Sequence, residues 1–170
     1  MEETIPKIKV RSQVDQSVIE ITKNSAKRSE ILKGLLNDYP DSTELTINEV
    51  NGKALEKIQE YLDHYDNKEP KEVQRPFKSK ILKECLNEFD YNFVSNVENY
   101  DDLKNLLLAA NFMHIKPLIN LLSATIAHKI KGLNTSDVRN TFGIKELNSE
   151  EQKFFEEDIK YIEGKVFKDL

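Results

Sequence analysis

The sequence has few of the residues on which catalytic and metal-binding motifs depend. Its 170 residues include one cysteine, Cys85, five glycines, three histidines and no tryptophan. A single cysteine excludes an intramolecular disulfide and a cysteine-rich zinc site, so cytoplasm and nucleus are the expected compartments. No glycine-rich phosphate loop and no G-x-S-x-G nucleophile motif occurs in the chain.

Long apolar runs and an excess of positive charge are also missing. The longest apolar run, Leu106–Ala110, is far too short to cross a bilayer, and the first ten residues do not have the apolar core of a signal peptide. A net charge of −5 argues against a dedicated nucleic-acid-binding protein. We therefore expect a globular protein with neither a nucleic-acid nor a membrane partner.

The histidines and the cysteine form no catalytic or metal-binding group. His64, His114 and His128 are scattered, and none has a carboxylate or cysteine at the spacing of zinc ligands. Cys85 has no neighbouring histidine, which favours a small buried residue over a nucleophile. No cofactor or metal is expected, and an enzymatic function has no positive support.

The N-terminal part of the chain has the pattern of a mixed α/β layer. Short apolar runs on either side of a polar segment predict a β-hairpin, with Ile19 and Ile21 on one face. Capping residues followed by apolar stripes at helical spacing predict helices. After the hairpin, the predicted elements are a helix from Asn24 or Ser25 to Asn37, a strand over 45–47, and a helix from Asn51 to residue 65.

The centre of the chain, residues 67–80, has two prolines and no apolar period, so a mobile loop is expected there. The loop is locally basic, but no aromatic platform or glycine-rich turn accompanies its lysines. This favours a solvated loop over a phosphate-binding patch. Helical spacing resumes from Ile81, and a polar turn is predicted over 89–99.

The segment Leu103–Ile144 is the richest in leucine and isoleucine, and its apolar residues recur at i, i+3, i+4 and i+7. It has more of them than a small domain readily buries, which indicates a partner-binding surface. One predicted helix has Pro117 in its first turn and Gly132 at its end. A second runs from Asn134 or Thr135 to Phe142. A third begins with a capping box at Ser149–Gln152.

Several motifs in this order resemble the S-phase kinase-associated adaptor family of SCF ubiquitin ligases. They are LAANF at Leu108–Phe112, IK at Ile115–Lys116, TIA at Thr125–Ala127, IKG at Ile130–Gly132 and VRNTFGI at Val138–Ile144. The resemblance implies an α+β fold, in which a BTB/POZ domain with a small three-stranded sheet flanked by helices occupies residues 1–115. A helical C-terminal extension that binds F-box proteins would occupy residues 116–170.

The resemblance further implies a non-catalytic adaptor that bridges the N-terminal region of a cullin to F-box substrate receptors. The implied F-box surface has a polar rim, Arg139 and Lys165, around apolar residues. For two of the apolar residues, Leu107 and Ile126, the sequence favours a core position and a surface position about equally. The apolar members are Leu107, Leu118, Ile126, Val138, Phe142, Ile144, Tyr161 and Ile162. The implied cullin surface includes Asn111 and Phe112, the latter in place of the family's usual tyrosine.

Three departures from the family pattern bear on partner choice. The central loop is shorter and basic rather than acidic, Tyr161-Ile162 replaces tryptophan-cysteine, and Ser149 stands where some members have a modifiable proline. Two other functions stay open. An elongin C-like cullin adaptor would tolerate loss of residues 133–170, and a self-associating BTB scaffold would act outside a ligase. A weak homodimer is expected when no partner is bound.

Overall fold

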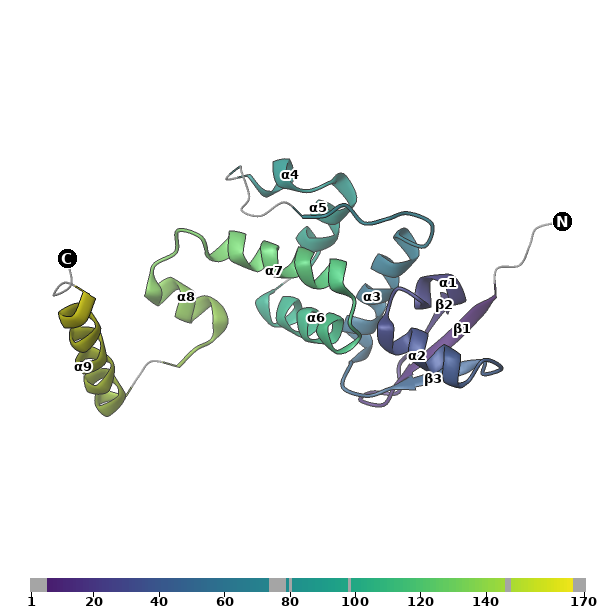
Figure 1. Ribbon diagram of the computed structural model, residues 1–170, viewed down its shortest axis with the longest axis horizontal. Helices are drawn as coiled ribbons and strands as arrows, with labels where there is room; N and C mark the ends of the chain where they lie inside the picture. The colour runs from purple at the N-terminus through teal and green to yellow at the C-terminus, as the bar shows by residue number, and fades with distance from the viewer. Residues whose placement is uncertain (1–5, 74–78, 80, 98, 146–147, 167–170) are drawn as a thin grey trace. The chain divides into compact units, whose positions relative to one another are not determined.

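A computed structural model of the protein describes residues 6–73, 79, 81–97, 99–145 and 148–166, with side chains as far as Lys160. The chain forms two compact units, residues 1–131 and 132–170 (Figure 1). The strands are β1 (Lys7–Ser12), β2 (Val18–Thr22) and β3 (Glu44–Ile47). The helices are α1 (Lys23–Ala26), α2 (Glu30–Asp38), α3 (Gly52–His64), α4 (Leu82–Cys85), α5 (Glu88–Ser95), α6 (Tyr100–Phe112), α7 (Lys116–Ile130), α8 (Thr135–Phe142) and α9 (Ser149–Val166).

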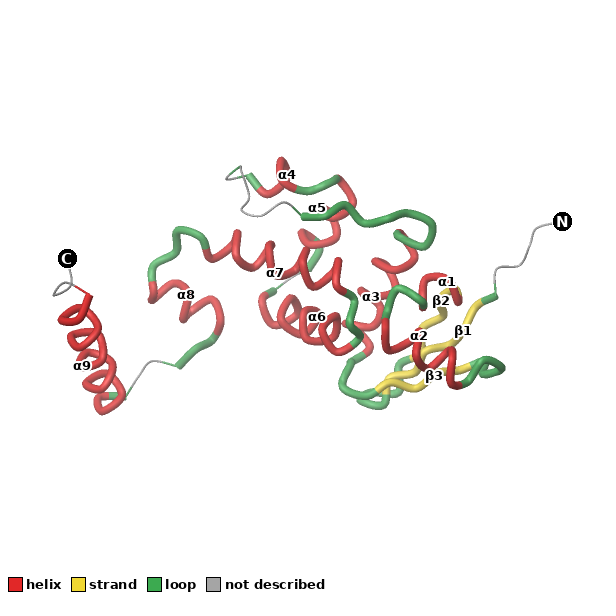
Figure 2. The backbone as a smooth tube through the Cα atoms, viewed as in Figure 1, coloured by secondary structure: helices red, strands yellow, loops and turns green. Residues whose placement is uncertain are grey.

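The three strands form one sheet in the order β2-β1-β3, in which β1 runs antiparallel to β2 and parallel to β3 (Figure 2). In the centre of the sheet Val10 is aligned with Ile19 on β2 and with Leu45 on β3, and all three side chains are buried. Lys9 and Glu20 lie on the other face and are exposed. This alternation confirms the predicted hairpin and third strand, because side chains of successive strand residues point to opposite faces.

The turn between β1 and β2 holds the N-terminus of α3. The predicted cap, Asn51, accepts a hydrogen bond from the Ala54 N–H at 2.9 Å. Asp15 accepts one from the Gly52 N–H at 2.6 Å and one from the Ser17 N–H at 3.2 Å, and these bonds lower the pKa of Asp15 to about 2. A Cβ atom on Gly52 would collide with the Ser17 hydroxyl, so this close approach requires glycine.

Helix α3 lies at the centre of the first unit, between β2 and α6, and α6 in turn packs against α7 (Figure 1). The apolar stripe predicted for α3 is buried along its whole length, because the 3.6-residue period places all of its residues on the inward face of the helix. The stripe consists of Leu55, Ile58, Tyr61, Leu62 and Tyr65. Helix α7 also buries Leu121 and Leu122, so the first unit extends to Lys131, past the boundary predicted at residue 115.

The predicted helix from Asn24 or Ser25 to Asn37 is two helices in the structure. The N-cap of the first helix, α1, is Thr22, whose hydroxyl accepts a hydrogen bond from the Ser25 N–H at 2.9 Å. A second cap follows at Ser29, whose hydroxyl accepts from the Leu32 N–H and so begins α2. The prediction was wrong because Ser29 offered a second helix start inside one apolar period.

The predicted polar turn over 89–99 was also wrong, because it contains most of α5. Asn87 caps this helix by accepting from the Asp90 N–H at 2.8 Å. The Asp90 side chain is buried and accepts hydrogen bonds from the Tyr65 hydroxyl at 2.8 Å and from Asn87 Nδ2 at 2.6 Å. Burial raises the pKa of Asp90, while the two hydrogen bonds act in the opposite direction.

An aromatic contact joins α5 to the end of α3. The His64 ring stacks on Phe89 with 3.5 Å between ring centroids, which assigns His64 a structural role. Of the predicted loop over 67–80, residues 74–78 and 80 lie outside the described part of the chain. Residues 67–73 form no helix or strand.

The helix α8 begins and ends at strong local signals. Asn134 caps it by accepting from the Asp137 N–H at 2.8 Å, which confirms one of the two predicted caps. Gly143 ends it with a φ of 61°, in the left-handed region that favours glycine. The Ile144 N–H donates to the Arg139 carbonyl at 2.9 Å, the long hydrogen bond of a Schellman motif.

The helix α9 begins with a capping box, one residue earlier than predicted. The Asn148 side chain accepts from the Glu151 N–H at 2.9 Å, and the Glu151 carboxylate accepts from the Asn148 N–H at 2.9 Å. This pair, and not Ser149 with Gln152, satisfies the free N–H groups at the helix start.

Candidate partner-binding surfaces

The described apolar side chains of the second unit are exposed or half-buried. Over residues 132–145 and 148–160, where side chains are described, none is buried. Two neighbouring aromatic residues on α9, Phe154 and Phe155, are 72% and 53% exposed. Apolar side chains gathered in this way in one segment are typical of interaction sites. The other exposed members are Leu133, Ile144 and Ile159.

Helix α8 brings together most of the predicted F-box residues of the second unit. Val138 and Phe142 lie four residues apart, on one face of the helix, and both are half-buried, as is Arg139. Ile144, whose N–H closes the Schellman motif, is 55% exposed. The backbone of Tyr161, Ile162 and Lys165 is helical, in α9, but their side chains lie outside the described residues.

The predicted F-box residues of the first unit differ in burial. Leu107 on α6 and Ile126 on α7 are half-buried and pack against the core, so each keeps part of its side chain at the surface. Leu118 is 0% exposed. Its assignment to the surface was therefore wrong, because the side chain faces inward from α7 and is covered by its own unit.

The two predicted cullin-binding residues lie at the end of α6, where Asn111 is exposed and Phe112 is half-buried against the core. A hydrogen bond holds this end of the helix. The hydroxyl of Ser29, a buried residue, donates to the Met113 carbonyl at 2.7 Å. His114 follows with a φ of 52°, and the chain then turns into α7. The backbone directly after Asn111 and Phe112 is thus tied to the cap of α2.

Among the exposed residues that were not predicted as site residues, three are more than half exposed and lie on α6 or α9. Leu108 is 57% exposed, on the outer face of α6 together with Asn111, and Phe154 and Phe155 are on α9. The sequence did contain an indication that Leu108 is exposed. Successive helix residues are separated by about 100°, so the run Leu106–Leu108 cannot place all three leucines in the core. For the phenylalanines the signal was apolar residues on a largely acidic helix.

The described residues contain no group of three or more His, Cys, Asp or Glu side chains that could hold a metal ion. Cys85 is half-buried, and its thiol lies 3.6 Å from the Ser79 carbonyl. In the part of the chain searched, no helix has the length and apolar character needed to span a membrane.

Comparison with known proteins gives matches over most of the chain. Residues 6–67 match the model of the Skp1 family tetramerisation domain, and residues 116–160 match that of the Skp1 family dimerisation domain. An S-phase kinase-associated protein 1 homolog of Tetrahymena thermophila is 30% identical over 164 residues, covering 96% of this chain and 98% of the relative. The SCF subunit sconC, of an E3 ubiquitin ligase complex in Arthroderma benhamiae, is 31% identical over 127 residues, covering 74% of this chain and 76% of the relative.

Proposed function

Since the chain belongs to the Skp1 family, we propose that it is a non-catalytic adaptor of an SCF-type ubiquitin ligase. It would bridge the N-terminal region of a cullin to F-box substrate receptors. The proposal rests mainly on the observation that the second unit has capped helices with exposed apolar side chains. The Arthroderma relative is named as a subunit of an SCF complex, which supports this proposal. Cytoplasm and nucleus are the proposed compartments.

The F-box residues proposed on the second unit are Val138, Arg139, Phe142 and Ile144, with Tyr161, Ile162 and Lys165 of α9. On the first unit, the exposed parts of Leu107 and Ile126 are proposed as further F-box contacts. A partner helix that covered Phe142 and Ile144 would remove their apolar surface from water. Each fully covered side chain of this size contributes about 1.5–3 kcal/mol of transfer free energy. Much of this is offset by the entropy lost on association, so a few well-covered residues would dominate the affinity.

The proposed cullin surface is the end of α6, with Asn111 and Phe112. Leu108 extends it along the outer face of the helix and is exposed to the solvent. Phe112 lacks the hydroxyl of the family's usual tyrosine, so restoring it with Phe112→Tyr would add about 0.5–1.5 kcal/mol to cullin binding if that hydroxyl finds a partner. The Ser29–Met113 hydrogen bond of 2.7 Å would keep this surface preformed.

A pulldown with an F-box protein tests the proposal. Phe142→Ala combined with Ile144→Ala removes two apolar anchors from the second unit and should abolish most of the binding. The control combines Tyr39→Ala with Val14→Ala, an exposed aromatic and an exposed aliphatic residue of the first unit, at 61% and 59% exposure. Undiminished binding by a folded Phe142/Ile144 variant would contradict the assignment of these two residues to the F-box surface.

Self-association is a second candidate function, favoured by the same exposed side chains and by the matched family models, which are described as tetramerisation and dimerisation domains. In our proposal it is a weak homodimer that forms when no F-box partner is present. A stable oligomer that persists in excess F-box protein would favour a self-associating scaffold. An elongin C-like adaptor would instead keep its substrate receptor after deletion of residues 133–170. Affinity purification with mass spectrometry distinguishes these outcomes.

A further inference from the structure

One face of α9 is apolar and open to the solvent. Over residues 149–160 every side chain is exposed, including Phe154 at 72%, Phe155 at 53% and Ile159 at 39%. Successive residues of a helix are about 100° apart, so these three side chains fall within an arc of about 140°. Together they form an apolar stripe on less than half of the helix circumference, which we call the α9 stripe.

Carboxylates lie directly beside the α9 stripe. Residues three and four positions apart are neighbours on a helix surface, and all four such neighbours of Phe154 are acidic. This acidic group consists of Glu150, Glu151, Glu157 and Asp158. Three of its members line an open hollow on the helix together with Phe154 and Phe155. The two lysines of this stretch, Lys153 and Lys160, lie on the opposite face, about 180° from the middle of the stripe.

The charge of the acidic group is not neutralised by neighbouring cations. Among the described residues, no lysine or arginine forms an ion pair with any of its four carboxylates. The Glu151 carboxylate accepts a hydrogen bond from the Asn148 N–H at 2.9 Å, and this bond leaves its negative charge in place. The acidic group therefore raises the local concentration of cations at the α9 stripe.

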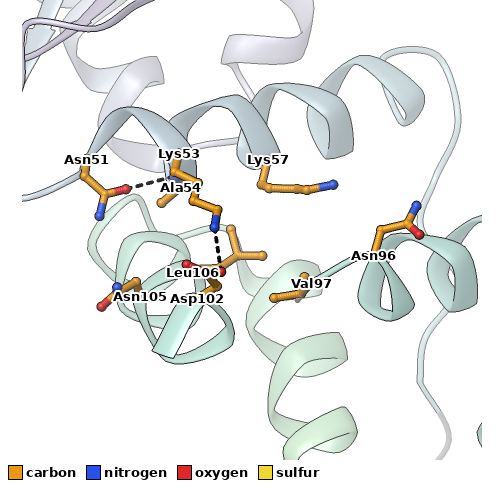
Figure 3. A pocket seen from close by; sticks show the side chains of 9 residues that line it. All are labelled: Asn51, Lys53, Ala54, Lys57, Asn96, Val97, Asp102, Asn105 and Leu106. Atoms are coloured by element: carbon orange, nitrogen blue, oxygen red, sulfur yellow. Dashed lines mark hydrogen bonds and ion pairs between the residues drawn. The ribbon is translucent and has the colours of Figure 1, made fainter. Parts of the chain in front are cut away.

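A pocket in the first unit shows the opposite case. It has a volume of about 130 Å³ and lies between α3, the start of α6 and the segment that joins α5 to α6 (Figure 3). Both of its lysines are paired, Lys53 with Asp102 at 2.6 Å and Lys57 with Glu60 at 2.7 Å. The pocket therefore favours no charged ligand, whereas the α9 stripe combines apolar surface with unbalanced negative charge.

The chemistry of this surface fits a basic amphipathic helix. The apolar face of such a helix would cover the α9 stripe, and lysine or arginine beside that face would meet the acidic group. A strand fits less well, because it binds by adding to the free edge of a sheet, and the backbone groups of α9 are paired within the helix. The same carboxylates would repel an anionic membrane and a nucleic acid.

We propose that the α9 stripe and its acidic group bind a basic amphipathic helix of the F-box receptor. The receptor as the source of this helix rests on the proposed function, because Tyr161 and Ile162 of the proposed F-box surface follow on α9. The acidic group would add specificity, since a receptor helix with carboxylates beside its apolar face would be repelled. It would also speed association at low salt.

Two synthetic peptides of about 18 residues, long enough to form a helix, test the chemistry of the stripe. Both have leucines at i, i+3, i+4 and i+7 on an alanine background, and the flanking positions are lysine in one and glutamate in the other. In NMR titrations of the isotope-labelled full chain, the lysine peptide should shift the amides of Phe154, Phe155 and Ile159 until they saturate. The glutamate peptide should bind at least tenfold more weakly. Added salt should weaken binding of the lysine peptide. Equal binding of the two peptides, or no saturable shift at these amides, would overturn the proposal.

Variants that remove charge test the acidic group itself. Glu157→Gln combined with Asp158→Asn should weaken binding of both the lysine peptide and an F-box protein by about fivefold, because each exposed ion pair contributes modestly. The matched control combines Glu156→Gln with Glu56→Gln. It removes the same charge from exposed residues on the opposite face of α9 and on α3. Equal loss in the two double variants would contradict the proposal, because the net charge of the chain would then explain the binding.

The measurement with the F-box protein separates this inference from the proposed function. If the Glu157/Asp158 variant binds the F-box protein as well as the wild type does, while the Phe142/Ile144 variant loses affinity, this inference is wrong and the proposed function stands. If the F-box protein does not bind the wild type at all, the proposed function is contradicted, and the receptor is not the source of the helix.

Discussion

The two units of the molecule obtain their structure in different ways. In the first unit apolar side chains from the sheet and from α2, α3, α5, α6 and α7 form one continuous core. In the second, no described side chain is buried, and the helices α8 and α9 are defined by local hydrogen bonds at Asn134, Gly143 and Asn148. The first unit is stable through packing. The second has good helix signals, but its described apolar side chains are exposed or half-buried.

This difference predicts where the protein tolerates substitution. Leu55→Ala on α3 leaves a cavity at a fully buried position and should lower the free energy of unfolding by about 2–5 kcal/mol. Ile159→Ala on α9 removes a side chain that is 39% exposed and should change it by less than about 0.5 kcal/mol. Urea denaturation of both variants measures the contrast. A large loss from Ile159→Ala would mean that the second unit has a core of its own.

Two glycines sharpen the comparison within the first unit. Gly52→Ala places a Cβ against Ser17 and should cost about 1–3 kcal/mol of stability, because the β1–β2 turn must move away from α3. Gly34→Ala, in the middle of α2, meets no atom within 4 Å and should stabilise the protein by about 0.4–1 kcal/mol. Thermal unfolding of the pair should give shifts of opposite sign. A shared sign would show that helix propensity, and not the close approach, decides the effect.

The second unit should respond to the loss of a cap. Asn134→Ala removes the acceptor of the Asp137 N–H and should destabilise α8 by about 1 kcal/mol. Hydrogen exchange should report faster exchange for amides in α8 and unchanged protection in α3. If α3 also lost protection, the two units would unfold together and the contrast between them would be wrong.

The pH dependence from Asp15 is expected to be small, because this side chain is exposed and solvent screens its interactions. Its pKa is lowered from 3.8 to about 2 in the folded protein, so its contribution to stability is present above pH 3.8 and is lost as the pH falls through 2. Asp15→Asn should therefore be less stable than the wild type at neutral pH, and the two should converge near pH 2. Urea midpoints at both pH values test this. A difference that persisted at low pH would exclude the carboxylate as its source.

Sequence patterns predicted what local spacing determines. The hairpin, the cap at Asn51, the apolar stripe of α3 and the cap at Asn134 all follow from short-range periodicity and turn chemistry. The break at Ser29 and the helix α5 were missed, because a competing cap or an aromatic-rich helix with a buried Asp90 does not show as an apolar period.

The candidate site was predicted in outline only. Leu118 and Leu107 share the same helical pattern, and only tertiary packing decides that the first is fully covered and the second is not. Asp15 and Gly52 are 37 residues apart in the sequence, so their hydrogen bond could not be anticipated from spacing. The pocket at Lys57 depends in the same way on three segments that meet only in the fold.

The central claim is that one chain carries two separate binding surfaces, one for F-box proteins and one for a cullin. A crossed affinity measurement tests it most directly, with both partners titrated against two double variants. Phe142→Ala with Ile144→Ala should weaken F-box binding by at least tenfold and spare the cullin, because aromatic and aliphatic anchors dominate such interfaces. Asn111→Ala with Phe112→Ala should do the reverse. If either variant weakened both partners equally while remaining folded, the two surfaces would not be separate.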